Sequence, residues 1–107
     1  MAGSIFFDSH NWPSSSSKLF YVFEYLADHV SDADTRARLR ELVDENIPLL
    51  DLRDPQDSVL VDLIADSLPQ HLQRLPDEEQ RRNLSKAFED LITFAQEQQS
   101  MNQEGKS

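Results

Sequence analysis

Residues 54–68 read DPQDSVLVDLIADSL and carry the clearest helix signal in this 107-residue chain. Asp54 is a favoured helix N-cap, and Pro55 suits the first helical position because the amide there has no intrahelical partner. Asp57 adds a favourable negative charge to the first turn. Apolar residues then recur at helical spacing, which predicts an amphipathic helix. Its expected buried stripe is Val59, Leu60, Leu63, Ile64 and Leu68.

Prolines separate this helix from its neighbours. Pro69 lacks an amide hydrogen and is expected to break or kink the helix. Pro48 is expected to end a preceding helix that starts at Asp32 or Asp34, because a proline disfavours helical geometry in the residue before it. Pro76 opens a last helix whose first turn is rich in acids.

The N-terminal part predicts one more helix and an arm. A serine run at 14–17 precedes an amphipathic segment that should end near Val30. The chain has two glycines and lacks hairpin turn sequences. These features predict an all-α fold, a compact bundle of about four helices on which residues 1–13 pack as an extended aromatic arm. We expect residues 1–99 to form a single helical domain and residues 100–107 a disordered tail.

Composition restricts the cellular setting. The chain contains no cysteine, which excludes disulfides and thiolate sites and is typical of a reducing compartment. Its N-terminus lacks the basic region and long apolar run of a signal peptide. No apolar stretch approaches the roughly 20 residues that a membrane-spanning helix needs. We therefore expect a cytoplasmic protein that does not bind membranes.

The sequence contains no recognisable catalytic or cofactor motif. The three histidines lack the i, i+4 spacing of paired metal ligands, and there is no glycine-rich phosphate loop or Gly-x-Ser-x-Gly elbow. Residues 32–36 begin like a calcium loop but lack its glycine and closing glutamate. His29 with Asp28 and Asp32 is an alternative metal cluster, although a surface histidine at a helix end is the favoured interpretation. We expect neither an enzyme nor a bound metal or cofactor.

Charge points to a class of partner. The formal net charge is -10, and residues 41–66 carry eight carboxylates against the single base Arg53. Such a field repels nucleic-acid backbones and speeds encounter with a basic surface. The one basic cluster, Arg36, Arg38 and Arg40, has acids close by that can neutralise it. We therefore expect a basic protein partner and no direct binding of nucleic acid.

Several of these carboxylates oppose local helix stability. Glu41, Asp44 and Glu45 lie at the C-terminal end of a helix, where the helix dipole favours cations. Asp62 and Asp66 are like charges one turn apart, and adjacent second and third helices would present all five side by side. A solvated surface that keeps the protein soluble is the alternative. The predicted partner-binding carboxylates are Glu41, Asp44, Glu45, Asp51, Asp62 and Asp66.

The first helix supplies a second candidate contact area. Tyr21, Glu24, Tyr25 and Asp28 share the face opposite the apolar stripe of this helix. Tyrosine combines rigid apolar area with a polar tip and is enriched in the energetic centres of interfaces. This face is therefore predicted to bind the partner too. Alternatively, the aromatic arm folds over both rings.

These observations support two functional hypotheses. In size, acidity and predicted helical content the chain resembles colicin nuclease immunity proteins, although it lacks the adjacent tyrosine pair that they carry. The resemblance and the charge imply an immunity-protein or antitoxin-type inhibitor that blocks a basic partner, such as a nuclease toxin, with carboxylates in place of phosphates. The alternative is a helical interaction or assembly module, a homodimer or regulatory adaptor, whose contact is the arm and the first helix. We favour a monomer.

Overall fold

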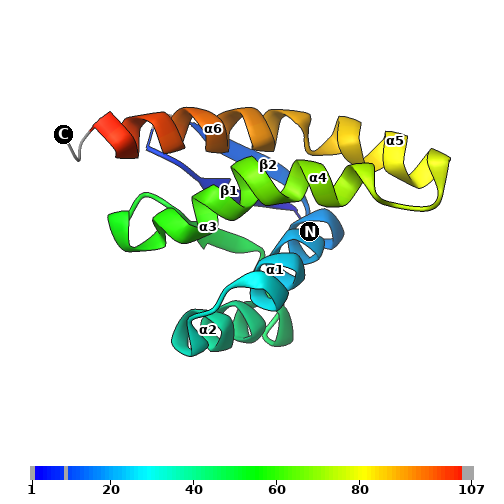
Figure 1. Cartoon of the computed structure of the whole chain (residues 1–107). Helices are drawn as coiled ribbons and strands as arrows, with labels where there is room; N and C mark the ends of the chain where they lie inside the picture. Colours follow the sequence, from blue (N-terminus) through cyan, green and yellow to red (C-terminus); the bar gives the residue numbers. More distant parts are fainter. Residues whose placement is uncertain (1, 9, 105–107) are drawn as a thin grey trace.

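The computed structural model describes residues 2–8 and 10–104 and combines helices with a three-stranded mixed sheet (Figure 1). Strand β1 (Ala2–Phe6) lies between β2 (Asn11–Ser15), with which it pairs antiparallel, and β3 (Leu49–Asp51), with which it pairs parallel. The expected all-α bundle of about four helices is therefore wrong. The predicted extended arm is a β-hairpin, and residues 49–51, which follow Pro48, supply the third strand.

The strands escaped prediction because each buries very few side chains. Ile5 and Phe7 alternate inward along β1 and its end, whereas Trp12 is the buried residue of β2 and Leu50 that of β3. With so few buried residues, the alternation of apolar and polar residues in these strands is too short to distinguish them from loops in the sequence. Pro13 also argues against a strand, but β2 is an edge strand, where a proline removes no hydrogen bond needed by a neighbour.

The helices follow the hairpin and alternate with short connections. A 3-10 turn, η1 (Pro55–Asp57), leads into α3, and a π turn, η2 (Leu63–Ser67), joins α3 to α4. Figure 1 shows α6 along one side of the molecule and α2 at the opposite side. The α-helices are α1 (Ser16–His29), α2 (Ala33–Asp44), α3 (Ser58–Asp62), α4 (Leu68–Gln73), α5 (Glu78–Ala87) and α6 (Glu89–Glu104).

The predicted helix starts at Asp32 and Asp54 are confirmed, whereas the serine run gives α1 no side-chain cap and the helix expected to open at Pro76 is capped by Asp77. The carboxylate of Asp32 caps α2 by accepting from the amide of Thr35 at 2.9 Å. Asp77 caps α5 by accepting from two amides of its first turn. Asp54 accepts from the amide of Gln56 at 2.9 Å, so it caps the 3-10 turn that precedes α3. Caps are predictable because donor and acceptor are close in sequence.

The C-terminal end of α2 differs from expectation. Helix α2 ends at Asp44, before Pro48, because Asn46 adopts a left-handed backbone with φ of 57°. The amide of Ile47 then donates to the carbonyl of Leu42 at 2.8 Å, which closes the helix end. Ile47 lies beyond the end of α2 and is exposed.

Pro69 does not end its helix. The chain remains helical from Ser58 to Gln73, and the π turn lies directly before the proline. There the amide of Leu68 donates to the carbonyl of Leu63, five residues back. A widened turn accommodates a residue that lacks a donor and whose ring would collide with the preceding turn of a regular α-helix.

The predicted last helix is divided into α5 and α6 at the buried residue Phe88. Helix α6 continues to Glu104, beyond the expected end near Gln99. Residues 100–104, part of the predicted disordered tail, are thus helical. The remainder of that tail, residues 105–107, lies outside the described residues.

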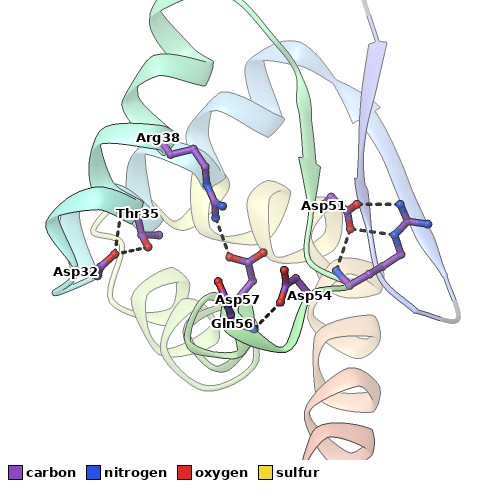
Figure 2. A network of polar contacts seen from close by, with 8 residues as sticks. Asp32, Thr35, Arg38, Asp51, Asp54, Gln56 and Asp57 are labelled. Atoms are coloured by element: carbon purple, nitrogen blue, oxygen red, sulfur yellow. Dashed lines mark hydrogen bonds and ion pairs between the residues drawn. The ribbon is translucent and has the colours of Figure 1, made fainter.

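An ion pair joins α2 to the start of α3. Nη2 of Arg38 donates to Oδ1 of Asp57 at 2.7 Å (Figure 2). The Asp57 side chain is 11% exposed, whereas that of Arg38 is 50% exposed. A carboxylate with so little access to water needs this partner.

Replacing Arg38 with methionine should lower the free energy of unfolding by about 1–2 kcal/mol, because Asp57 loses its charged donor while the arginine's own exposure limits the effect. Urea unfolding measures the change. Arg82→Met is the control, since Arg82 is an exposed arginine of α5. Equal losses for the two variants would contradict a stabilising role of the Arg38–Asp57 pair.

Candidate functional site

Helices α1 and α2 pack as a helical hairpin, and carboxylates of both helices lie along their junction. Nη2 of Arg40 donates to Oδ1 of Asp28 at 3.1 Å. Glu24 lies one turn before Asp28 in α1, and Asp44 lies one turn after Arg40 in α2. Both carboxylates line a pocket of about 90 Å³. The structure thus joins residues that were predicted from two unrelated features, the tyrosine face and the acidic stretch. The pocket is completed by Phe23, Ala27, Arg40 and Val43.

The arginines of α2 are used inside the molecule. Nη2 of Arg36 donates to the carbonyl of Val30 at 2.8 Å, which braces the connection between α1 and α2. Arg38 and Arg40 make the ion pairs given above. Two of the three arginines in the basic cluster are therefore paired with carboxylates, and the third is hydrogen-bonded to a backbone carbonyl.

Four carboxylates on this side of the molecule have no such partner. Glu41 and Asp44 lie in the last turn of α2, and Glu45 follows as its C-cap. These three and Glu24 of α1 are exposed, and within residues 2–8 and 10–104 no ion pair involves any of them. We call Glu24, Asp28, Glu41, Asp44 and Glu45 the acidic surface.

Asp62 and Asp66 belong to another part of the fold. Nε2 of Gln99 in α6 donates to Asp62 Oδ1 at 3.0 Å and to Asp66 Oδ2 at 2.8 Å. The amide thus bridges the two like charges whose spacing was unfavourable in the isolated helix. Because α6 and α2 lie on opposite sides of the molecule (Figure 1), the structure does not bring this pair beside the acids of α2.

Asp51 is held by its own neighbour. Both of its carboxylate oxygens accept from the guanidinium of Arg53, at 2.9 Å and 2.8 Å (Figure 2). These hydrogen bonds lower the pKa of Asp51 to about 2. Arg53 also lies over the ring of Phe6, 5.9 Å from its centroid. The Asp51 carboxylate is therefore engaged at the edge of the sheet, away from the acidic surface.

The two tyrosines of α1 are covered, although not by the N-terminal residues. Tyr25 is 6% exposed, and its hydroxyl hydrogen-bonds Ser67 of the π turn. Tyr21 is half-buried against Phe88, with ring centroids 5.7 Å apart. Its hydroxyl contacts Nε2 of His71 in α4 at 2.9 Å. The structure agrees with the alternative in which both tyrosine rings are covered. The covering residues are Ser67, His71 and Phe88, and not those of the N-terminal arm.

Two histidines join these tyrosines, and sequence reasoning did not place them in the binding face. His29 stacks on Tyr25 with centroids 4.1 Å apart, and its Nδ1 contacts the Tyr25 carbonyl at 2.8 Å. The i, i+4 spacing of this pair was a usable signal. His71 arrives from α4, so only tertiary packing brings it 4.8 Å from the Tyr25 centroid.

These side chains form a cleft of about 230 Å³ beside the acidic surface. Burial raises the pKa of the Tyr21 hydroxyl, so this group stays protonated where it hydrogen-bonds Nε2 of His71. An adjoining pocket contains Ser67 and Arg74. We call the first space the Tyr–His cleft; it is lined by Tyr21, Glu24, Tyr25, Asp28, His29 and His71.

The cleft makes stability sensitive to acid. Burial, with a smaller contribution from nearby His29, lowers the pKa of His71 below its ordinary value of about 6.5. The unfolded chain therefore binds a proton at higher pH than the native protein, and stability falls as pH decreases below that value.

We expect the melting temperature of the wild type to fall more steeply between pH 7.5 and pH 5 than that of a His71→Gln variant, since pH 6.5 lies within this range. Thermal unfolding at a series of pH values provides the measurement. Gln73→Ala, which changes an exposed and non-titratable residue of α4, is the matched control and should keep the wild-type slope. Parallel curves for wild type and His71→Gln would contradict the prediction.

Comparisons with protein families, with curated proteins and with solved structures found no match to this chain. The described residues contain no cluster of three or more side chains suited to hold a metal ion. Nor does any helix in the described ranges combine the length and apolarity needed to cross a membrane. The surface chemistry of this chain is therefore the basis for proposing a function.

Proposed function

We propose that this protein is a small acidic binding protein of the immunity-protein or antitoxin kind, which blocks a basic partner such as a nuclease toxin through the acidic surface. The observation that carries the proposal is the set of unpaired carboxylates over α1 and α2, beside arginines that are all engaged internally. We place its action in the cytoplasm, in agreement with a chain that has no cysteine.

The position of these acids supports a role beyond solubility. Glu41 and Asp44 lie in the last turn of α2, a turn that contains no basic residue. Each carboxylate there opposes the helix dipole at a cost of about 0.3–1 kcal/mol at low salt. Binding to a cationic surface would offset this cost, because opposite charges meet and mutual repulsion falls.

The same surface suits inhibition of a nuclease. A groove that binds nucleic acid is lined by cations that neutralise phosphates. Carboxylates spread over two packed helices can occupy such cations and exclude the substrate. A net charge of -10 also accelerates the encounter at low ionic strength.

The Asp44→Lys/Glu45→Lys double variant should bind the basic partner about tenfold or more weakly at low salt, and the difference should shrink at high salt. The fold should remain intact or gain slightly in stability, because cations suit the C-terminal end of α2. The partner is first co-purified from native cells and identified. Its association rate is then measured at two salt concentrations, together with its nuclease activity and a melting curve of each variant.

Glu78→Lys/Glu79→Lys is the matched control, because it changes the net charge equally in the first turn of α5. It should retain most of the binding. If the control and the α2 variant behave alike, net charge rather than the acidic surface governs binding. A captured partner whose activity persists at saturating amounts of this protein would overturn the inhibitor proposal.

The alternative, an assembly module, is supported by a different observation. Ile47 and Leu49 are 38% and 49% exposed, and Leu49 belongs to β3, an edge strand. Exposed apolar side chains beside an open strand edge favour pairing with a second copy. The aromatic contact first considered for such a module is not available, since Phe7, Trp12 and Tyr25 are buried within the molecule. Light scattering separates the hypotheses: a 12.3 kDa monomer favours the inhibitor, and a stable dimer favours the module.

A further inference from the structure

The Tyr–His cleft offers a ligand carboxylates, the half-buried ring of Tyr21 and the exposed ring of His29. The ring of Tyr25 is only 6% exposed, because those of His29 and His71 pack against it. The hydroxyl groups of the cleft are already engaged, that of Tyr21 with His71 and that of Tyr25 with Ser67. Nδ1 of His29 is engaged as well, by the carbonyl of Tyr25. What remains open toward solvent includes the Glu24 carboxylate, which has no hydrogen bond or ion pair within the described residues.

This combination selects a cation. The negative face of an aromatic ring attracts a positive group placed within about 6 Å of its centroid. Tyr21 and Tyr25 are one helical turn apart, and Glu24 and Asp28 continue the same face, so rings and carboxylates line one cleft. An anion would meet two carboxylates there, and a neutral ligand would leave Glu24 unpaired.

Among protein cations, arginine fits this cleft better than lysine. Its planar guanidinium stacks on aromatic rings, presents several donors to two carboxylates at once and is less strongly hydrated than an ammonium group. One of the carboxylates that line the cleft, Asp28, already pairs with the guanidinium of Arg40, which lines the neighbouring pocket. Both members of that pair are more than half exposed, so their interaction is weak and an incoming arginine can share or replace it.

The cations near the cleft also define the direction of approach. Arg74 lines the adjoining pocket with Ser67 and His71, on the α4 side. The acidic surface lies on the other side, along α1 and α2, and Glu24 belongs to both the acidic surface and the cleft. A basic partner held by the acidic surface would therefore reach the cleft from the side of Glu24.

We infer that the Tyr–His cleft seats an arginine side chain of the basic partner, with the guanidinium against the rings of Tyr21 and His29 and with Glu24 and Asp28 as hydrogen-bond acceptors. The inference rests on the proposed function and adds a specific contact to it. In this arrangement the acidic surface attracts the basic partner, and the cleft recognises one of the partner's arginine side chains.

The test is an NMR titration of the full chain with three short acetylated peptides that differ at one central position: arginine, lysine or citrulline. The arginine peptide should produce saturable shifts at the ring and amide resonances of Tyr21, Tyr25 and His29. The lysine peptide should bind roughly twofold to fivefold more weakly, as expected for a lost stacking contribution at an accessible site. Citrulline, which keeps the planar shape without the charge, should give no saturable shift.

A Glu24→Gln variant removes one acceptor charge without removing any internal contact, and it should weaken binding of the arginine peptide by a few-fold. Glu78→Gln, on α5, is the control and should bind like the wild type. Shifts outside the cleft, equal binding of the arginine and lysine peptides, or no effect of Glu24→Gln would overturn the inference. The proposed function fails separately, if the Asp44→Lys/Glu45→Lys variant binds the co-purified basic partner as tightly as the wild type does.

Discussion

Replacing Phe88 with alanine is expected to lower the free energy of unfolding by about 3–5 kcal/mol, the usual loss when a buried phenylalanine ring is deleted. Phe88 is 0% exposed at the junction of α5 and α6. Its ring lies 5.7 Å from that of Trp12 in the hairpin and 5.7 Å from that of Tyr21 in α1. One side chain therefore joins three parts of the chain, and neighbouring groups cannot easily close the resulting cavity.

Urea unfolding followed by circular dichroism measures this loss, and Trp12, the only tryptophan in the sequence, reports on the hairpin. Its fluorescence should shift to longer wavelength in the folded variant, since Trp12 is buried and loses a packing neighbour. Phe94→Ala is the matched control, because Phe94 is half-buried on α6 and should cost clearly less. A Phe88→Ala loss no greater than that of Phe94→Ala, with unchanged fluorescence, would contradict this account of the core.

A Gly3→Ala substitution is the second change with a large expected effect. A Cβ atom on residue 3 would lie 1.9 Å from the carbonyl oxygen of Pro48 and 2.6 Å from its Cβ. The same carbonyl accepts a hydrogen bond from the amide of Ser4 at 3.0 Å, so the two segments cannot separate without losing that bond. We expect a loss of about 3 kcal/mol or more, at the upper end for overpacked sites.

Amide hydrogen exchange measures the loss of stability and shows where in the structure it occurs. The amides of Ser4 and Leu52, which donate to Pro48 and Phe6 across the β1–β3 junction, should exchange faster in Gly3→Ala. Ser14→Ala, at the position that pairs with Gly3 on the other side of β1, is the control and should change stability little. Unaltered exchange at Ser4 in the glycine variant would show that β3 does not approach Gly3 as closely as described.

Local chemistry made the helix starts predictable. Asp32, Asp54 and Asp77 cap their segments through amides two or three residues away, so the full interaction is visible in the sequence. The C-terminal ends of the helices were harder to predict from the sequence. Asn46 ends α2 by adopting a left-handed backbone, a conformation that asparagine permits and does not impose.

The candidate site was predictable in part, for a related reason. Helical spacing correctly grouped Glu24 with Asp28 on one face of α1 and placed Asp44 at the end of α2. Spacing within a helix does not show which other helix covers that face. His71 and Ser67 cover the tyrosines from elements more than 40 residues away in sequence, and Gln99 captures Asp62 and Asp66 from a helix over 30 residues away.

The sequence by itself determined most helical segments, their caps and the excess of negative charge, because these depend on residue type and on neighbours within a few positions. Only the tertiary structure decided that residues 4–6 pair with residues 49–51 in a sheet. It also decided which acids stay unpaired. Hydrogen bonds between β1 and β3, and between Gln99 and its two aspartates, join groups that are far apart along the chain, and their formation depends on how the whole core packs.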